Sequence, residues 1–404
     1  MSTQRHRLER NLTLLKWLSI DETLFASAVI IAFELHTVGL SLAQVLLGES
    51  IFALTIILVD IPTSVYSDLI NRKSSFIIAE LCLLIGVVTL AFAQNFLWII
   101  VSQIVWGIGV AALSGTDSAM LYDTLKALKR EDEHRAVLGK IESFFLISIA
   151  LGQVFSGFIG AWDLRFTVQL CILVPIIKLL LILLLEEPPR KPHPHAHEPF
   201  THLLRTLRWF STQGTLVLLV LASMTASLGG KIAMQTFNPY LELIKVPIIY
   251  WGILMAGFNI VGAVIARNAH TIQKKLGSMR SFALIYILEA GGFFLMAKLQ
   301  LFFFAAFLPF LFWSFISFRK IFFSNEINRR TESHRRATTL SIESFGIQLL
   351  QMCSLSFLGL YADRAGLPAM YLLLAAVLAV VGAGAGLGLR RAFRQDRKSL
   401  QTNV

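Results

Sequence analysis

Long apolar segments alternate with short polar connections along almost the whole chain. A membrane-spanning helix needs about 20 apolar residues, and backbone polar groups in lipid must be hydrogen-bonded within their own segment. Each apolar segment is therefore predicted to be a helix. The predicted spans are 11–36, 41–68, 74–95, 97–125, 136–161, 165–186, 214–241, 247–270, 279–298, 301–328, 336–361 and 367–390. The pattern predicts an all-α integral membrane protein with twelve transmembrane helices.

Basic residues concentrate in every second connection. Connections after even-numbered spans hold Arg72, Lys73, Lys126, Lys129, Arg130, Arg135, Arg190, Lys191, Arg205, Arg208, Lys274, Lys275, Arg280, Arg329, Arg330, Arg335 and Arg336. Connections after odd-numbered spans hold Arg165, Lys245, Lys298 and Arg364. Cytoplasmic loops carry the excess of Lys and Arg. We expect the even connections and both termini in the cytoplasm, and the chain in the cytoplasmic (inner) membrane.

The longest connection, 187–212, divides the chain near its middle. It is proline-rich and polar, so we interpret it as a linker between two six-helix bundles, 1–186 and 213–404, the second with a basic tail. The mix of apolar and basic residues over 203–210 predicts a short amphipathic helix on the inner membrane surface. Its histidines either bind a metal or belong to a solvated linker, and the intervening prolines favour the linker. These histidines are His193, His195, His197 and His202.

One short sequence occurs twice. Residues 131–144 read EDEHRAVLGKIESF and residues 332–345 read ESHRRATTLSIESF, 201 residues further along the chain. Both copies lie where a charged loop enters a long apolar segment. The repeat indicates that the protein consists of two related halves.

Composition narrows the class of protein. Hydrophobic residues make up 55% of the chain and charged residues 15%, against about 25% charged in a soluble domain. The net charge of +11 lies in the short connections, so it indicates membrane topology and not binding to nucleic acid. No nucleophile, metal-ligand or phosphate-loop pattern appears, which argues against an enzyme and against a bound cofactor or metal.

The end of the second span, IPTSVYSDLINRKSS, carries a family signature. It resembles the loop Gly-x-x-x-Asp-x-x-Gly-Arg-Arg/Lys of the major facilitator superfamily. Asp68, Arg72 and Lys73 match the pattern, whereas Ser64 and Asn71 replace its glycines. The resemblance implies two pseudo-symmetric six-helix bundles that transport by alternating access. In the second half the corresponding loop, IQKKLGSMR, has no Asp.

Drug–proton antiporters are the branch that the chain resembles, with two departures. Their span-four Arg, four residues before a Gly, is replaced by Gln103 before Gly107. Their Gly-x-x-x-Gly-Pro element is replaced by LGQVFSGFIG, which has no Pro. Small residues there, and in the GAGAGLG run at 382–388, still predict close helix packing.

Ionisable residues inside spans are costly, so they usually face a cavity or a partner. The resemblance implies that spans one, four, seven and ten line a central cavity. The candidate charged residues on these spans are Asp21, Glu22, Asp117, Lys231 and Arg319, and Lys320 follows Arg319 in span ten. These residues bind a substrate, which either carries both charges or has a polar head and an apolar body. Alternatively, they form a salt bridge across the two halves that locks one conformation. The remaining alternative is local pairing within each half, or a span that ends earlier so that Arg319 reaches water. Snorkelling or structural pairing explains Glu80, Lys178 and Glu289 on the remaining spans.

A cytoplasmic gate is the second predicted site. Its candidate residues are Asp68, Arg72, Lys73, Glu142, Glu343, Arg335 and Arg336. A helix N-terminus attracts anions, so Asp68 is expected near the start of span eleven, beside Arg335 and Arg336. Glu142 and Glu343 either complete this latch, carry a proton, or only preserve ancestral repeat packing.

These observations predict a secondary active transporter for a small amphiphilic or zwitterionic organic molecule, with proton-coupled export as the expected mode. An uncoupled facilitator, an importer and a lipid flippase of the same fold remain alternatives, and a non-transporting receptor is disfavoured by the lack of long extramembrane segments. Expected partners are membrane lipids and the small-molecule substrate, with the protein as a monomer. No cofactor is expected beyond a coupled proton.

Overall fold

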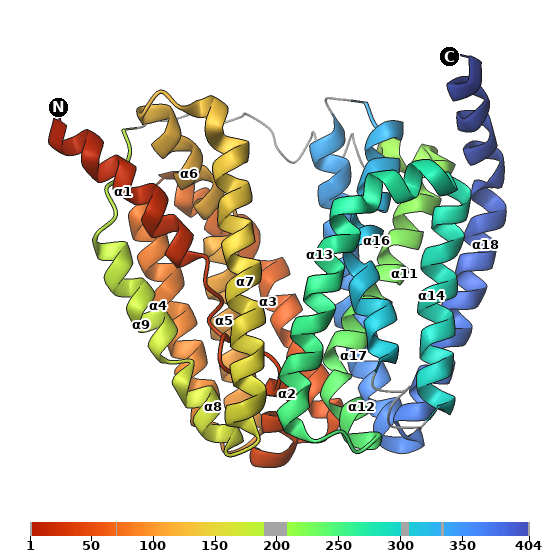
Figure 1. Cartoon of the computed structure of the whole chain (residues 1–404), viewed down its shortest axis with the longest axis horizontal. Helices are drawn as coiled ribbons and strands as arrows, with labels where there is room; N and C mark the ends of the chain where they lie inside the picture. Colours follow the sequence, from red (N-terminus) through yellow and green to blue (C-terminus); the bar gives the residue numbers. More distant parts are fainter. Residues whose placement is uncertain (1, 70, 190–207, 300–306, 333–334, 403–404) are drawn as a thin grey trace. The chain divides into compact units, whose positions relative to one another are not determined.

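A computed structural model describes residues 2–69, 71–189, 208–299, 307–332 and 335–402. Side chains are described for these residues except 2, 3, 61–69, 309–314, 337, 391 and 394–402. All regular secondary structure in this described part is helical, as Figure 1 shows. Ten of its helical segments are long and apolar enough to cross a membrane. The predicted all-α membrane fold is confirmed.

The chain divides into two compact units. The first comprises residues 1–194 together with 247–256, and the second comprises 195–246 and 257–404. The short segment 247–256 is grouped with the first unit, although it follows the linker in the sequence. The predicted amphipathic helix in the linker falls largely on residues 190–207, which lie outside the described residues, although residues 208–212 are helical.

The first unit contains the helices up to the linker. They are α1 (Ser2–Leu18), α2 (Ile30–Ala32), a π-helix (Phe33–Thr37), α3 (Leu42–Leu69), α4 (Arg72–Ala91), α5 (Phe96–Leu113), α6 (Thr116–Ala127), a 3₁₀ turn (Glu131–Glu133), α7 (His134–Gly160), α8 (Leu164–Leu170) and α9 (Leu173–Leu183).

The remaining helices follow the linker. They are α11 (Gly214–Gln235), α12 (Phe237–Leu243), a 3₁₀ turn (Ile248–Tyr250), α13 (Trp251–Leu276), α14 (Ser278–Lys298), α16 (Leu308–Arg330), α17 (Arg336–Ala365) and α18 (Leu367–Thr402). Residues 251–256 of α13 belong to the first unit and the rest of α13 to the second.

The prediction of one continuous helix over 11–36 is wrong. The chain leaves helical geometry after Leu18 and runs through turns from residue 19 to residue 29. Asp21 contributes to this break, because its Oδ1 accepts the backbone N–H of Thr23 at 2.7 Å, a local bond that competes with the helical ladder. We call residues 19–29 the unwound segment of span one.

Span four, predicted as one helix over 97–125, is also interrupted. α5 ends at Leu113 and α6 begins at Thr116, with Gly115 between them at φ = +75°. Only glycine adopts this left-handed conformation without strain, so the sequence permits the break at this point. The spans predicted at 165–186 and 214–241 are likewise each divided into two helices.

Small residues on α7 bring the unwound segment onto the helix. The hydroxyl of Ser156 accepts the backbone N–H of Ala28 at 3.2 Å. Gly152 and Gly160, one helical turn on either side, lie against Leu24 and Val29. Small side chains at i, i+4 and i+8 leave a groove in which a non-helical backbone can lie. The LGQVFSGFIG sequence therefore receives the unwound segment of span one.

An apolar cluster lies beside this region and positions the ends of four helices. It consists of Leu14, Leu15, Leu18, Phe76, Met120, Leu121, Leu125, Ile182 and Leu185. Asn11, fully buried on α1, exchanges hydrogen bonds with both backbone groups of Glu186 at 2.8 and 3.0 Å. α1 is thereby tied to the chain that follows α9.

Gly152→Ala tests the contact between α7 and the unwound segment. A Cβ at Gly152 would meet the side chain and carbonyl oxygen of Leu24, and overpacking of this kind costs about 1–3 kcal/mol. We expect a lower midpoint of thermal unfolding for the detergent-solubilised protein. Gly139→Ala on the same helix is the matched control, because nothing lies within 4 Å of a Cβ there. Equal midpoints for the two variants would contradict the close contact.

Candidate functional site

The first unit contains a cavity of about 270 Å³ at the two helix breaks. Its walls come from the end of α1, the unwound segment of span one, α4, the α5–α6 break, α7 and α9. The residues that line it are Leu15, Leu18, Ser19, Ile20, Asp21, Glu22, Phe76, Leu113, Asp117, Ser118, Leu121, Leu138, Ile141, Glu142, Phe145 and Lys178. Nine of these sixteen residues are apolar, so the cavity combines an apolar wall with charged groups.

Lys178, which lines this cavity, connects α9 with two other parts of the first unit. Its ammonium on α9 forms an ion pair with Glu22 of the unwound segment and a second with Glu80 of α4, where the Nζ–Oε2 distance is 3.3 Å. Lys178 and Glu80 are almost completely buried. Buried charges persist in proteins only when they are paired. The three side chains, which we call the Lys178 cluster, therefore hold the unwound segment against α4 and α9.

Asp21 and Asp117, both predicted from the sequence, meet at the same cavity. Asp21 is fixed by Thr23, whose backbone N–H and hydroxyl both donate to its Oδ1. Asp117 lies in the first turn of α6, and its Oδ1 accepts the backbone N–H of Ser118 at 2.6 Å. A carboxylate at a helix N-terminus is stabilised by the helix dipole. Both helix breaks thus present a carboxylate to the cavity.

The charge around the cavity is predominantly negative. Four carboxyl side chains line it, those of Asp21, Glu22, Asp117 and Glu142, against the one ammonium of Lys178. That ammonium already forms ion pairs with Glu22 and Glu80. The remaining field favours a positively charged group beside an apolar body. Glu142, predicted for the gate, is thus placed by the structure in the wall of this cavity.

The second unit buries a separate ion pair. Arg319 on α16 donates from Nη1 to Oε1 of Glu289 on α14 and to the carbonyl of Ala226 on α11, both at 2.6 Å. Gly230 lies against the guanidinium, where a Cβ would collide with it. Arg319 is therefore engaged in local pairing, the alternative that the sequence left open. Lys231, also on α11, is half-buried.

Arg72 and Lys73 of the signature loop are bound within the first unit. Their backbone N–H groups, at the start of α4, donate to the two carboxylate oxygens of Glu187 at 2.9 Å each. Arg72 Nε lies 3.5 Å from the Asp123 carboxylate on α6. Lys73 Nζ donates to carbonyl oxygens of Leu183 and Leu185. The loop thus anchors the beginning of the linker, while the side chain of Asp68 lies outside the described residues.

The other gate candidates lie in the second unit. Arg335 contacts Glu332 at 3.3 Å and covers the ring of Trp209, and Arg336 Nε donates to the carbonyl of Thr331. Glu343 on α17 accepts the hydroxyl of Ser223 on α11. The two repeat glutamates therefore have different surroundings. The predicted latch from Asp68 to Arg335 and Arg336 stays a prediction.

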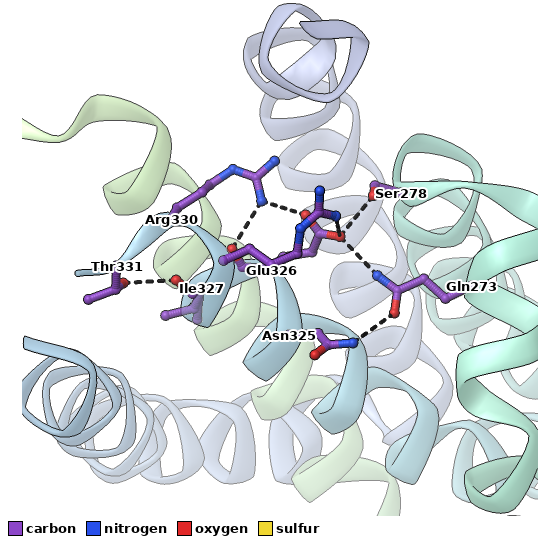
Figure 2. A network of polar contacts seen from close by, with 8 residues as sticks. Gln273, Ser278, Asn325, Glu326, Ile327, Arg330 and Thr331 are labelled. Atoms are coloured by element: carbon purple, nitrogen blue, oxygen red, sulfur yellow. Dashed lines mark hydrogen bonds and ion pairs between the residues drawn. The ribbon is translucent and has the colours of Figure 1, made fainter. Parts of the chain in front are cut away.

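A polar network joins three helices of the second unit, as Figure 2 shows. Glu326 on α16 is fully buried and accepts Gln273 Nε2 at 2.9 Å and Ser278 Oγ at 2.8 Å. Arg329 and Arg330 complete its coordination as ion-pair partners. Gln273 and Ser278 flank the turn between α13 and α14. The turn between α13 and α14, which corresponds to the signature loop but has no Asp, is therefore held in place by Glu326 of α16.

Lys178, Glu80 and Glu289 are expected from the sequence to be paired structurally or to lie near span ends, and the structure shows them in ion pairs. Their place beside the candidate site was not predicted, because they lie outside the spans that the resemblance assigns to a cavity. A signal was present: one ionisable side chain stands near the middle of an otherwise apolar span in each case. The sequence alone does not give the partner of such a residue.

The sequence model of the Major Facilitator Superfamily matches residues 18–319. The chain belongs to the Major Facilitator Superfamily. No curated protein sequence matches it. As a superfamily member with this fold, it is a multi-pass membrane transporter, and the prediction that it is not an enzyme is confirmed.

Solved structures of the same fold include three kinds of transporter. A mutant of the nucleoside transporter NupG has a TM-score of 0.81 at 14% identity, over 94% of this chain and 98% of that one. A bacterial homolog of the human lysosomal transporter Spinster has a TM-score of 0.73 at 17% identity, over 98% and 99%. A POT family transporter in complex with a thioalcohol conjugated peptide has a TM-score of 0.73 at 13% identity, over 95% and 96%. At these identities the likeness establishes the fold alone.

Lys178→Met tests whether the Lys178 cluster is a unit. Removing one partner of a buried ion pair costs about 3–5 kcal/mol, because the other charge is left uncompensated. We expect lower yield and a lower midpoint of thermal unfolding. Lys178→Met/Glu80→Gln is expected to recover part of the loss, because neutralising both members is milder than removing one. A double variant no more stable than Lys178→Met would contradict the pairing.

Proposed function

We propose that this superfamily member is a secondary active transporter that exports a small amphiphilic or zwitterionic organic molecule in exchange for protons. It would lie in the cytoplasmic membrane with both termini inside and work by alternating access of its two halves. The observation that carries the proposal is the cavity of the first unit. Four carboxyl groups and a wall of leucine, isoleucine and phenylalanine face a volume of about 270 Å³. Such a site suits a positively charged head on an apolar body.

The positive group of the substrate is assigned to Asp21 and Asp117. Both carboxylates line the cavity, and among the described residues they accept hydrogen bonds from positions within two residues in the chain. In the described part of the chain, the direct ion pairs of Lys178 are with Glu22 and Glu80, which favours Asp21 and Asp117 as the groups that meet an incoming cation. Lys231 on α11 is the proposed partner for an anionic group, as the sequence analysis expected.

A thermal-shift experiment with matched ligands tests this assignment. A short alkyltrimethylammonium should stabilise the purified protein, whereas the alkyl sulfate of equal chain length should not. Asp117→Asn should remove most of the shift, because the cavity loses a carboxylate. Glu133→Gln is the control, since this exposed acid pairs with Arg130 and does not line the cavity. Equal shifts by both ligands, or an unchanged shift in Asp117→Asn, would reject the site.

Transport itself is measured in proteoliposomes with a ligand found in this way. Asp117→Asn and Lys231→Ala are both expected to abolish flux of a zwitterion without loss of folded protein. Lys231→Ala should still respond to the alkyltrimethylammonium in the thermal-shift experiment, because the first-unit cavity is intact. Wild-type flux in either variant would exclude that residue from the substrate site.

Glu80 is the proposed carrier of the coupled proton. Its side chain is almost fully buried, and its Oε1 has no hydrogen-bond partner among the described residues. Two carboxylates share the one ammonium of Lys178, so binding a proton relieves the excess negative charge. Glu80→Gln should keep downhill exchange but lose accumulation driven by a pH gradient. Accumulation equal to wild type would place coupling elsewhere.

An uncoupled facilitator is the alternative, and Gln103 favours it. This residue stands on α5 where the antiporters that the chain resembles carry an Arg. An importer and a lipid flippase of the same fold also remain open. Wild-type flux with and without a pH gradient separates the coupled from the uncoupled mode.

The cytoplasmic latch is retained as a proposal that joins Asp68 to Arg335 and Arg336. Its test is a double-mutant cycle on transport rate. If the residues act together, Asp68→Asn and Arg335→Ala/Arg336→Ala should each slow transport, and their combination should be no slower than either alone. Additive losses would contradict a shared latch.

A further inference from the structure

A groove of about 660 Å³ runs between α14 and α18 in the second unit. These two helices lie side by side along the edge of the unit (Figure 1). The groove is lined by Met279, Phe282, Ala283, Tyr286, Ile287, Ala290, Ala379, Gly382, Ala383, Gly386, Leu387 and Arg390. None of these residues lines the cavity of the first unit, which we call the acidic cavity, and the proposed transport function does not use the groove.

Glycines of the GAGAGLG run give the groove its depth. Gly382 lies against the ring of Tyr286, where a Cβ would collide with it. At Gly386 a Cβ would stand 3.4 Å from Met279 Cε and 3.5 Å from Phe282 Cε1, which is ordinary van der Waals contact. Ile287 and Leu387 form exposed rims. Aromatic rings and glycine backbone thus form the floor of the groove, and aliphatic side chains form its edges.

The length of the groove matches one leaflet of a bilayer. Its α14 wall extends from Met279 to Ala290, about 16 Å of helix. Half of the hydrocarbon core of a typical membrane is about 15 Å. One acyl chain that enters from the membrane surface therefore has the length to fill it.

A cation stands at one end. Arg390 is exposed, lines the groove and is the last residue of the membrane-spanning part of α18. Lys274, Lys275 and Arg280 lie at the same end, around the start of α14. A guanidinium forms paired hydrogen bonds with a phosphate, and basic clusters beside a span attract anionic lipid headgroups.

Hydrogen bonding and charge argue against two other occupants of the groove, a polar substrate and a second copy of the chain. A polar substrate would find few groups to bind, because the hydroxyl of Tyr286 already contacts Thr225 and the carbonyl of Ala222. A second copy related by a two-fold axis normal to the membrane would bring a second Arg390 to the same depth. Like charges at one level oppose that pairing.

We propose that the α14–α18 groove is a binding site for an anionic phospholipid of the leaflet beside Arg390, with one acyl chain in the groove and the phosphate on the guanidinium. Two features select this ligand from bulk lipid. The glycine floor admits a chain below the level of the neighbouring side chains, and Arg390 distinguishes an anionic from a zwitterionic headgroup.

Native mass spectrometry of the full-length protein tests the site. The protein is reconstituted with equal amounts of phosphatidylglycerol and phosphatidylcholine that carry the same acyl chains. Wild type should retain phosphatidylglycerol preferentially, as one tightly held molecule. Arg390→Gln should reduce the preference about tenfold, which is the size expected for loss of a charged hydrogen bond. Gly386→Leu should remove the retained lipid, because the new side chain fills the groove.

Gly384→Leu is the matched control. It makes the same change one half-turn away, where nothing lies within 4 Å of a Cβ, and it should retain lipid as wild type does. The thermal midpoint of each variant in lipid-free detergent checks that it is folded. Equal retention by Gly386→Leu and Gly384→Leu would overturn the proposal. So would a dimer that is lost only in Gly386→Leu, because the groove would then belong to a second copy.

Discussion

The first unit depends on one shared ammonium. Lys178 attracts Glu22 from a segment that consists of turns and Glu80 from α4. Without it, the unwound segment would carry two adjacent carboxyl groups into an apolar interior with little to offset their desolvation. The glycine and serine groove on α7 provides the space for that segment, and the Lys178 cluster provides the attraction. The acidic cavity exists because span one is held open in this way.

The two halves solve the same problems with different residues. Each half buries one glutamate in its third predicted span, Glu80 in α4 and Glu289 in α14. The cation that pairs with it comes from α9 in one half and from α16 in the other. Each also ties the turn before that helix to an acid on a later helix. Arg72 meets Asp123 in the first unit, and Gln273 meets Glu326 in the second. Each unit thus contains a buried, paired acid at this place, and the partner differs between the two.

The sequence predicted the fold in outline and missed its breaks. Hydropathy over a window of about 20 residues identifies a span whether or not its helix is continuous. The break at Gly115 depends on a positive φ, and the break after Leu18 depends on a groove in α7, more than one hundred residues away. Asp21, Glu22 and Asp117 were predicted as site residues because a carboxyl group inside a span is costly wherever it lies, and the structure places all three at one cavity. Lys178 was expected only to be paired, because its two partners come from segments far away in the sequence.

The repeated IESF sequence shows how far such similarity can be taken. Glu142 lines the acidic cavity, whereas Glu343 accepts a hydroxyl from Ser223 on the neighbouring helix. Identical residues at matching positions therefore differ in what surrounds them. In the first-unit cavity, Glu142 lies with three other carboxyl groups and one ammonium, which is itself shared by Glu22 and Glu80. The two repeat positions therefore differ in how their charges are paired, although their sequences match, and the repeat by itself does not give the two glutamates one role.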